Sequence, residues 1–184
     1  CIRDRPQEVE RVMVANPGSR ASRSLAGVIV EALEVVATRL SERSSELGRL
    51  DSVAGDGDHG IGMARGSRAA LAEARRVSGD GAGAATTLNA AGSAWSEHAG
   101  GTSGALWGAV LTAFGAVLGD EDPAGEDTIP RAARAALDAV TRLGGAGVGD
   151  KTMVDAMDPF VTTLESSSDP LPQAWKSALS LIHI

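Results

Sequence analysis

The sequence predicts an all-α protein, an antiparallel helical bundle or barrel, and three observations favour this class. Aromatic residues make up only 3% of the 184 residues and Tyr is absent, so the core must be built from small aliphatic side chains. This composition suits closely packed helices better than a β-sandwich, whose strands favour aromatic and β-branched residues. Apolar residues recur at i, i+3, i+4 spacing in several segments, and no segment shows the period of two that is typical of strands.

Six amphipathic segments follow one another along the chain, separated by short joints. Ser22 or Ser24 is expected to cap the first helix, and Gly48 is expected to end it. A last helix is expected after Pro170 and Pro172. The predicted helices show ordinary apolar stripes, whereas the glycine- and aspartate-rich segments lie in the joints between them. The apolar stripes cover residues 25–40, 61–77, 84–98, 106–117, 133–143 and 153–164.

Charge and cysteine content exclude several classes of protein. The chain has 17 basic and 24 acidic residues, a net charge of −7, which argues against a surface for nucleic acid or an anionic membrane. No apolar run approaches the roughly 20 residues of a membrane span. Cys1 has no partner for an internal disulfide, which is typical of a cytoplasmic protein.

The two ends of the chain differ from its middle. Residues 1–18 are charged and contain two prolines, so we expect a linker or the tail of a preceding domain. Residues 179–184, Leu-Ser-Leu-Ile-His-Ile, resemble the translation of an adaptor used in sequencing libraries and are expected to be non-native. The folded domain is therefore expected to cover residues 19–178.

The first joint, residues 51–62, is rich in glycine and aspartate. Asp51, Asp56 and Asp58 place three carboxylates within eight residues. Like charges at close range repel one another, and a hard divalent cation, which prefers oxygen ligands, removes that cost. The three aspartates could hold two Mg²⁺ beneath a polyphosphate, and a solvated turn is the alternative. His59 is either a donor to a phosphate oxygen or a structural or surface residue.

Two further glycine-rich joints precede predicted helices. In residues 100–104, backbone N–H groups at the helix start could form an anion site together with the hydroxyls of Thr102 and Ser103. An N-cap without a ligand is the alternative. In residues 144–149, the glycines could let an adenine lie flat against the backbone. The alternative there is a helix end followed by an N-cap at Asp150.

Three motifs in this order together resemble the nucleotide-binding domain of the dihydroxyacetone kinase family, its L subunit or C-terminal domain. Three ordered motifs are far more specific than any one of them, and the likeness covers roughly residues 22–178. The resemblance implies a barrel of eight antiparallel helices with the nucleotide at one end. The motifs are Asp51-x4-Asp56-x-Asp58-His59-Gly60, Gly101-Thr102-Ser103-Gly104-Ala105-Leu106-Trp107-Gly108 and Gly149-Asp150-Lys151-Thr152-Met153.

The resemblance also implies a role for each joint. Asp51, Asp56 and Asp58 would hold two Mg²⁺ that bridge the phosphates of ATP or ADP. Gly62 stands where the family often has Asn, and the family's C-terminal Arg and Asp-Pro-Gly segment is not found, so the last helix is expected to be truncated. The nucleotide itself would be bound by eight residues from the three joints: His59, Gly60, Ile61, Gly62, Thr102, Ser103, Gly144 and Met153.

The function that this resemblance implies is that of the ATP-binding domain of a dihydroxyacetone-type ketose kinase. The γ-phosphate of ATP would pass in line to a small ketose held by a separate ketose-binding domain, and this chain alone would bind nucleotide without turning it over. The alternative is an ADP-retaining phosphocarrier subunit that docks a phosphotransferase-system protein or a regulator. The leader at residues 1–18 favours the fused kinase. No nucleic-acid or membrane partner is expected, and a homodimer is left open.

Overall fold

The computed structural model describes residues 17–122, 125–167 and 173, and within them it contains helices and no strands. The predicted all-α class is confirmed. Residues 1–16 of the leader expected at residues 1–18, the last helix expected after Pro170 and the tail at residues 179–184 lie outside the described residues. The helices are α1 (Arg20–Glu42), α2 (Ser44–Asp51), α3 (His59–Gly79), α4 (Ala84–Ala99), α5 (Gly101–Leu118), α6 (Thr128–Gly144) and α7 (Met153–Ser166).

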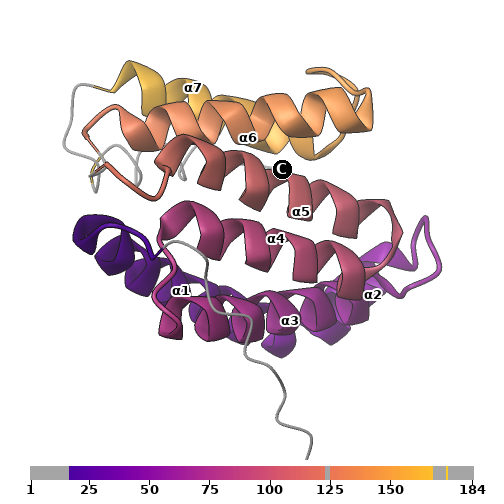
Figure 1. Cartoon of the computed structure of the whole chain (residues 1–184). Helices are drawn as coiled ribbons and strands as arrows, with labels where there is room; N and C mark the ends of the chain where they lie inside the picture. The colour runs from indigo at the N-terminus through magenta and orange to yellow at the C-terminus, as the bar shows by residue number, and fades with distance from the viewer. Residues whose placement is uncertain (1–16, 123–124, 168–172, 174–184) are drawn as a thin grey trace, which may run out of the picture.

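The long helices pack side by side, each next to its neighbour along the chain (Figure 1). α4 lies between α3 and α5, α6 lies between α5 and α7, and α1 packs against α3 and α4. From α3 onward, consecutive helices run in opposite directions because only short connections join them. The α2–α3, α4–α5 and α6–α7 connections therefore lie at one end of the molecule, on the right in Figure 1. The topology thus brings the three glycine-rich joints to the same end.

Small residues build the core, as the composition predicts. Twelve of the buried core residues are alanine, and seven of them, among them Ala26 and Ala70, are completely inaccessible. Glycines allow α4 and α5 to approach closely, because a Cβ on Gly92 would lie 2.6 Å from the carbonyl oxygen of Gly108, and one on Gly108 would lie 2.7 Å from that of Gly92. This close approach fixes the spacing of the two helices that lead to the second joint.

Several helix ends differ from the sequence-based expectation. The side chain of Ser19, and not that of Ser22 or Ser24, caps α1 by accepting a hydrogen bond from the Ser22 amide. The first helix ends before Gly48, at Arg43, where a separate short helix α2 begins. Apolar periodicity could not locate this break because α2 has no buried residue.

Ser22 instead joins three helices at the end opposite the glycine-rich joints. Its hydroxyl is buried, donates to the carbonyl of Gly119 after α5 (3.2 Å) and accepts from the Ala84 amide at the start of α4 (2.8 Å). Asp120 caps α4 beside it, since its carboxylate accepts hydrogen bonds from the backbone N–H (3.2 Å) and the hydroxyl (2.6 Å) of Thr86. Side chains thus satisfy the free amides in the first turn of α4.

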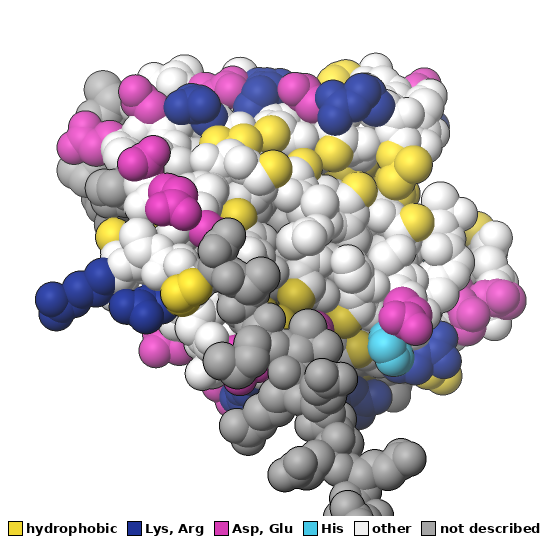
Figure 2. Space-filling view, viewed as in Figure 1, with side chains coloured by type: hydrophobic (Ala, Val, Ile, Leu, Met, Phe, Trp, Pro, Cys, Tyr) yellow, Lys and Arg dark blue, Asp and Glu magenta, His cyan; other side chains and the backbone are white. Residues whose placement is uncertain are grey.

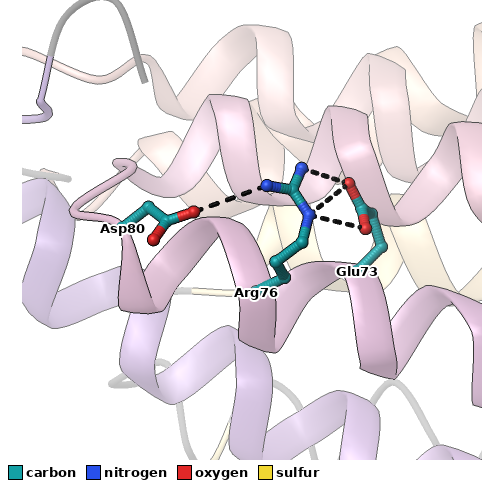
Figure 3. Close-up of polar contacts among 3 residues, drawn as sticks. All are labelled: Glu73, Arg76 and Asp80. Carbon is teal, nitrogen blue, oxygen red and sulfur yellow. Dashed lines mark hydrogen bonds and ion pairs between the residues drawn. The ribbon is translucent and has the colours of Figure 1, made fainter. Parts of the chain in front are cut away.

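An ion-pair network lies near the C-terminal end of α3 (Figure 3). The guanidinium of Arg76 binds both carboxylate oxygens of Glu73 and one carboxylate oxygen of Asp80. These hydrogen bonds lower the pKa of Glu73 and raise that of Arg76. The pairs are open to solvent, so their contribution to stability is small, and their main effect is to place a cation at the negative end of the helix dipole.

Helix α5 is the one described helix that is long and apolar enough to cross a membrane, with a mean hydropathy of 1.4 over 18 residues. A core helix has the same composition, and both faces of α5 are packed. Trp107 contacts the core cluster of α3 and α4, whereas Leu106, Val110 and Phe114 contact the cluster of α6 and α7. These contacts place apolar side chains of α5 against both neighbouring clusters.

We expect Ser22→Ala to lower the free energy of unfolding by about 1–3 kcal/mol, because it leaves a buried amide and a carbonyl without their hydroxyl partner. Chemical denaturation followed by circular dichroism measures this change. Ser24→Ala is the matched control, since the Ser24 hydroxyl is exposed and bonds only to Arg20 of its own helix; its effect should stay within about 0.5 kcal/mol. Equal effects of the two substitutions would contradict the assignment of Ser22 as the inter-helix link.

Candidate functional site

The first joint is folded around the carboxylate of Asp51, the last residue of α2. One oxygen of Asp51 accepts a hydrogen bond from the Gly57 amide at 2.9 Å, so the loop closes over the end of α2. Gly57 has φ of +82°, a left-handed conformation that glycine adopts without a steric cost. Asp58 follows at the N-cap of α3, where its side chain makes no capping hydrogen bond. The Asp58 carboxylate therefore does not cap α3.

The structure brings the three aspartates together. One carboxylate oxygen each from Asp51, Asp56 and Asp58 lies within 4.8 Å of the others. The negative charge of Asp56 is the main reason that the pKa of Asp58 is raised above its ordinary value, and a hydrogen bond with Asp56 adds to it. Such repulsion is unfavourable, and a cation bound between these oxygens would relieve it.

The first turn of α3 lies directly against α2. A Cβ on Gly60 would lie 1.9 Å from the carbonyl oxygen of Ser44, so only glycine fits this contact. His59 is half-buried beside the aspartates, whereas the side chain of Ile61 is 64% exposed. The close approach at Gly60 fixes how α3 leaves the carboxylate cluster.

The second joint forms the N-terminus of α5. Gly100 and Gly101 both have left-handed φ values, +74° and +61°, and Gly100 is the N-cap residue without a side-chain hydrogen bond to the helix. Thr102 and Ser103 thus lie inside the first turn and do not act as caps. Because a glycine cap leaves the first N–H groups of α5 available, an anion can bind them together with the two hydroxyls.

The first and second joints face each other across one open cavity of about 320 Å³. This is at the lower end of the volume range of small-molecule sites. Figure 2 shows acidic and basic side chains at the right-hand end of the view, the end at which α2 lies in Figure 1. The cavity is lined by Asp51, Asp56, Asp58, His59, Gly62, Met63, Arg65, Ala99, Gly100, Gly101, Thr102 and Ser103.

Four predicted site residues do not line this cavity. Gly60 is buried against α2, and Ile61 is exposed. Gly144 and Met153 belong to the third joint, which lies at the same end of the bundle: a Cβ on Gly144 would lie 3.7 Å from Leu106, one turn along α5 from Ser103. Met153 packs against the core cluster of α6 and α7. The third joint therefore lies beside the cavity wall and not within it.

The third joint is held by two aspartates. An N-cap at Asp150 was one of the two alternatives for this joint, but Asp150 does not cap α7. Its carboxylate instead accepts a hydrogen bond from the Gly147 amide at 2.7 Å. Thr152 is the cap, and Asp155 completes a capping box by accepting from the Thr152 amide at 2.9 Å. Asp155 also accepts from the Gly149 amide at 2.6 Å, and these backbone donors lower its pKa.

Sequence reasoning missed two side chains in the cavity, Met63 and Arg65. Arg65 is the only Lys or Arg among the lining residues. The sequence feature that could have identified Arg65 is its position three residues after the predicted site residue Gly62, because residues three apart on a helix share a face. Apolar periodicity does not mark it, since it stands on the polar side of α3.

The donor set fits a hard divalent cation. Its three members are carboxylates, the ligands that Mg²⁺ prefers, whereas a zinc site would use His or Cys. Each Mg²⁺ typically takes one or two carboxylates and leaves its other positions to water and phosphate oxygens. An anion at the N-terminus of α5 would lie across the cavity from these ligands. The arrangement can therefore bind a metal–phosphate complex.

Comparison with known proteins identifies the family of helical domains to which this chain belongs. A family model described as the DAK2 domain matches residues 53–183. The chain belongs to the DAK2 domain family, the nucleotide-binding domains of dihydroxyacetone and erythrulose kinases. It is 49% identical to the D-erythrulose kinase of Mycolicibacterium smegmatis over 159 residues, 85% of this chain and 27% of that kinase.

Relatives of two kinds match. The L-erythrulose kinase of Pectobacterium atrosepticum is 42% identical over 92% of this chain and 29% of its own length. The ADP-binding subunit DhaL of the PEP-dependent dihydroxyacetone kinase 1 of Listeria innocua is 31% identical over 74% of this chain and 68% of the subunit. The chain thus spans less than a third of the length of the erythrulose kinases that it matches.

A solved structure shares the fold. The dihydroxyacetone kinase of C. freundii, crystallised in complex with AMP-PNP and Mg²⁺, superposes with a TM-score of 0.68 and 26% identity. The match covers 97% of this chain and 30% of that kinase.

We expect Asp155→Asn to destabilise the protein at neutral pH, because the backbone amides of Gly149 and Thr152 lose a charged acceptor. Since the pKa of Asp155 is lowered in the folded protein, its contribution is fully present above the unfolded value of 3.8 and is lost as pH falls through the folded value. Denaturant titrations at pH 7 and below pH 4 measure this.

The control for Asp155→Asn is Asp158→Asn, which makes the same charge change on the same helix without removing these bonds. The difference between the two variants should shrink in acid. A difference that is the same at both pH values would show that the lost interaction is not ionic.

Proposed function

We propose that this chain is the ATP-binding domain of a ketose kinase, which passes the γ-phosphate of ATP to a small ketose held by a separate domain. The observation that carries the proposal is the convergence of Asp51, Asp56 and Asp58 in the cavity that also contains Thr102 and Ser103. A polyphosphate cannot approach three carboxylates unless divalent cations screen the repulsion.

The residues of the chain would act by binding and orientation. Two Mg²⁺ held by the three aspartates would neutralise the charge that develops on the β- and γ-phosphates. The first N–H groups of α5 and the hydroxyls of Thr102 and Ser103 would hold the phosphate oxygens by hydrogen bonds. His59, half-buried at the cavity wall, would donate to a phosphate oxygen.

The base of the nucleotide would lie toward the third joint. A Cβ on Gly144 would lie 3.7 Å from the side chain of Leu106, which stands one turn along α5 from Ser103. Met153, at the start of α7, is partly buried and has a flexible thioether that can cover a flat ring. In this proposal the phosphates bind between α3 and α5, and the adenine binds between α5 and α7.

The ketose hydroxyl would come from the partner domain. We propose a four-carbon ketose as its substrate, because relatives named as erythrulose kinases are 42–52% identical to this chain, against 30% for the dihydroxyacetone kinases of Komagataella pastoris and Citrobacter freundii. The ADP-retaining phosphocarrier is the second candidate, and the match to the DhaL subunit of Listeria innocua favours it. The higher identity to the erythrulose kinases supports the kinase as the first candidate.

Removal of the carboxylates tests the metal site. We expect Asp56→Asn combined with Asp58→Asn to weaken Mg²⁺-dependent ATP binding by more than about 100-fold, since loss of an outer-shell partner alone typically costs 10–100-fold. Isothermal titration calorimetry with and without EDTA measures the change. Asp138→Asn, an exposed aspartate on α6 away from the cavity, is the control and should bind as the wild type does. Wild-type ATP binding that is equally strong in EDTA would contradict the proposal.

The phosphate donor is tested on the intact protein that contains this chain and its ketose-binding domain. We expect ATP and erythrulose to give phosphorylated ketose without phosphotransferase components, and dihydroxyacetone to react more slowly. A coupled assay for ADP, with mass spectrometry of the product, measures both. Absence of product, with ADP retained through purification, would instead support the phosphocarrier.

A further inference from the structure

We propose that Arg65 is a positioning residue, which holds the α4–α5 joint against α3 and thereby sets where Thr102 and Ser103 meet the carboxylates. The inference rests on the proposed function, since it concerns the same cavity. Arg65 stands in the second turn of α3, and its side chain reaches the end of α4. Its Nε donates to the carbonyl of His98, and one terminal nitrogen donates to the carbonyl of Ala99 at 3.2 Å.

These two carbonyls belong to the last turn of α4. The final four carbonyls of a helix have no partner within it and carry the negative end of the helix dipole. A guanidinium that binds two of them makes charge-assisted hydrogen bonds of fixed geometry. Arg65 thus ties the C-terminus of α4 to the helix that begins at His59.

Gly62 makes room for this contact. A Cβ at Gly62 would lie 2.8 Å from the carbonyl oxygen of Ala99, which is the acceptor that Arg65 uses. Gly62 and Arg65 are three residues apart and therefore present one face of α3 to the end of α4. The close approach at Gly62 and the two hydrogen bonds from Arg65 both hold the C-terminal end of α4 at Ala99.

The joint beyond this point has little rigidity of its own. Gly100 and Gly101 are both left-handed, and a Cβ on Gly101 would meet no atom within 4 Å. Two consecutive glycines leave the backbone many alternative conformations. Thr102 and Ser103 follow directly, so their position depends on how firmly Ala99 is held. The Arg65 clamp supplies that constraint from the side of the carboxylate cluster.

The test measures nucleotide binding in two variants of Arg65 on the full 184-residue chain. We expect Arg65→Met to weaken Mg·ADP binding about tenfold or more, the scale of a lost charge-assisted hydrogen bond. Arg65→Lys should be intermediate, because an ammonium keeps the charge but lacks the planar fork that reaches two carbonyls. Arg68→Met is the control: Arg68 is exposed, binds only Ala64 of its own helix and does not line the cavity.

A second readout needs no nucleotide. Hydrogen exchange of the amides of residues 100–104 should accelerate in Arg65→Met and stay at the wild-type rate in Arg68→Met, because only the first substitution releases the joint. Binding of Mn²⁺ alone should not weaken, since Arg65 makes no hydrogen bond to the three carboxylates.

Three results would overturn the inference. Unchanged exchange in Arg65→Met shows that the joint is held by other contacts. Nucleotide binding by Arg65→Lys equal to that of the wild type shows that the charge alone matters. Loss of Mn²⁺ binding together with ADP binding indicates general damage to the fold. Wild-type protein that binds no Mg·ADP overturns the proposed function instead, and the exchange experiment still decides the role of Arg65.

Discussion

The structure depends on the enforced proximity of three carboxylates that repel one another. Asp51, Asp56 and Asp58 place oxygens within 4.8 Å of one another, and the raised pKa of Asp58 records the cost. The fold imposes this proximity through backbone contacts: the Gly57 amide binds Asp51, and Gly60 allows α3 to press against α2. The proposed metal site would relieve this repulsion, which is why the carboxylate cluster carries the proposed function.

Helix topology turns three separate loops into one functional end. Short connections force neighbouring helices to alternate in direction, so the joints before α3, α5 and α7 lie together (Figure 1). The opposite end is held by the buried hydroxyl of Ser22 and the carboxylate of Asp120. Both ends contain left-handed glycines, Gly81 and Gly119 at the Ser22 end and Gly57 and Gly100 among those at the other. What distinguishes the end with the three joints is the cavity between the carboxylates and the start of α5.

Local pattern predicted much of this and missed what depends on tertiary contact. The spacing of Leu, Val and Ala predicted six of the described helices. The clustering of aspartates in a glycine-rich loop pointed to the three carboxylates that now line the cavity. The break at Arg43 was missed because α2 buries no residue. Ser22 was predicted as a cap, but its partners are 62 and 97 residues away, which no local rule can reach. Arg65 was missed for the same reason, since its acceptors lie 33 and 34 residues further on.

The charge balance of the cavity explains why its only basic side chain is turned to the backbone. If Arg65 paired with the aspartates, it would neutralise them and compete with a cation for their oxygens. Bound to the carbonyls of His98 and Ala99, it leaves all three carboxylates free and still places a positive charge beside the N-terminus of α5. The acidic cluster and the nearby positive charge both favour the proposed ligand, an anion bound as a complex with divalent cations. One helix end thus holds the arginine away from the acids, and the amides at the next helix start face the same cavity, as the proposed phosphate site requires.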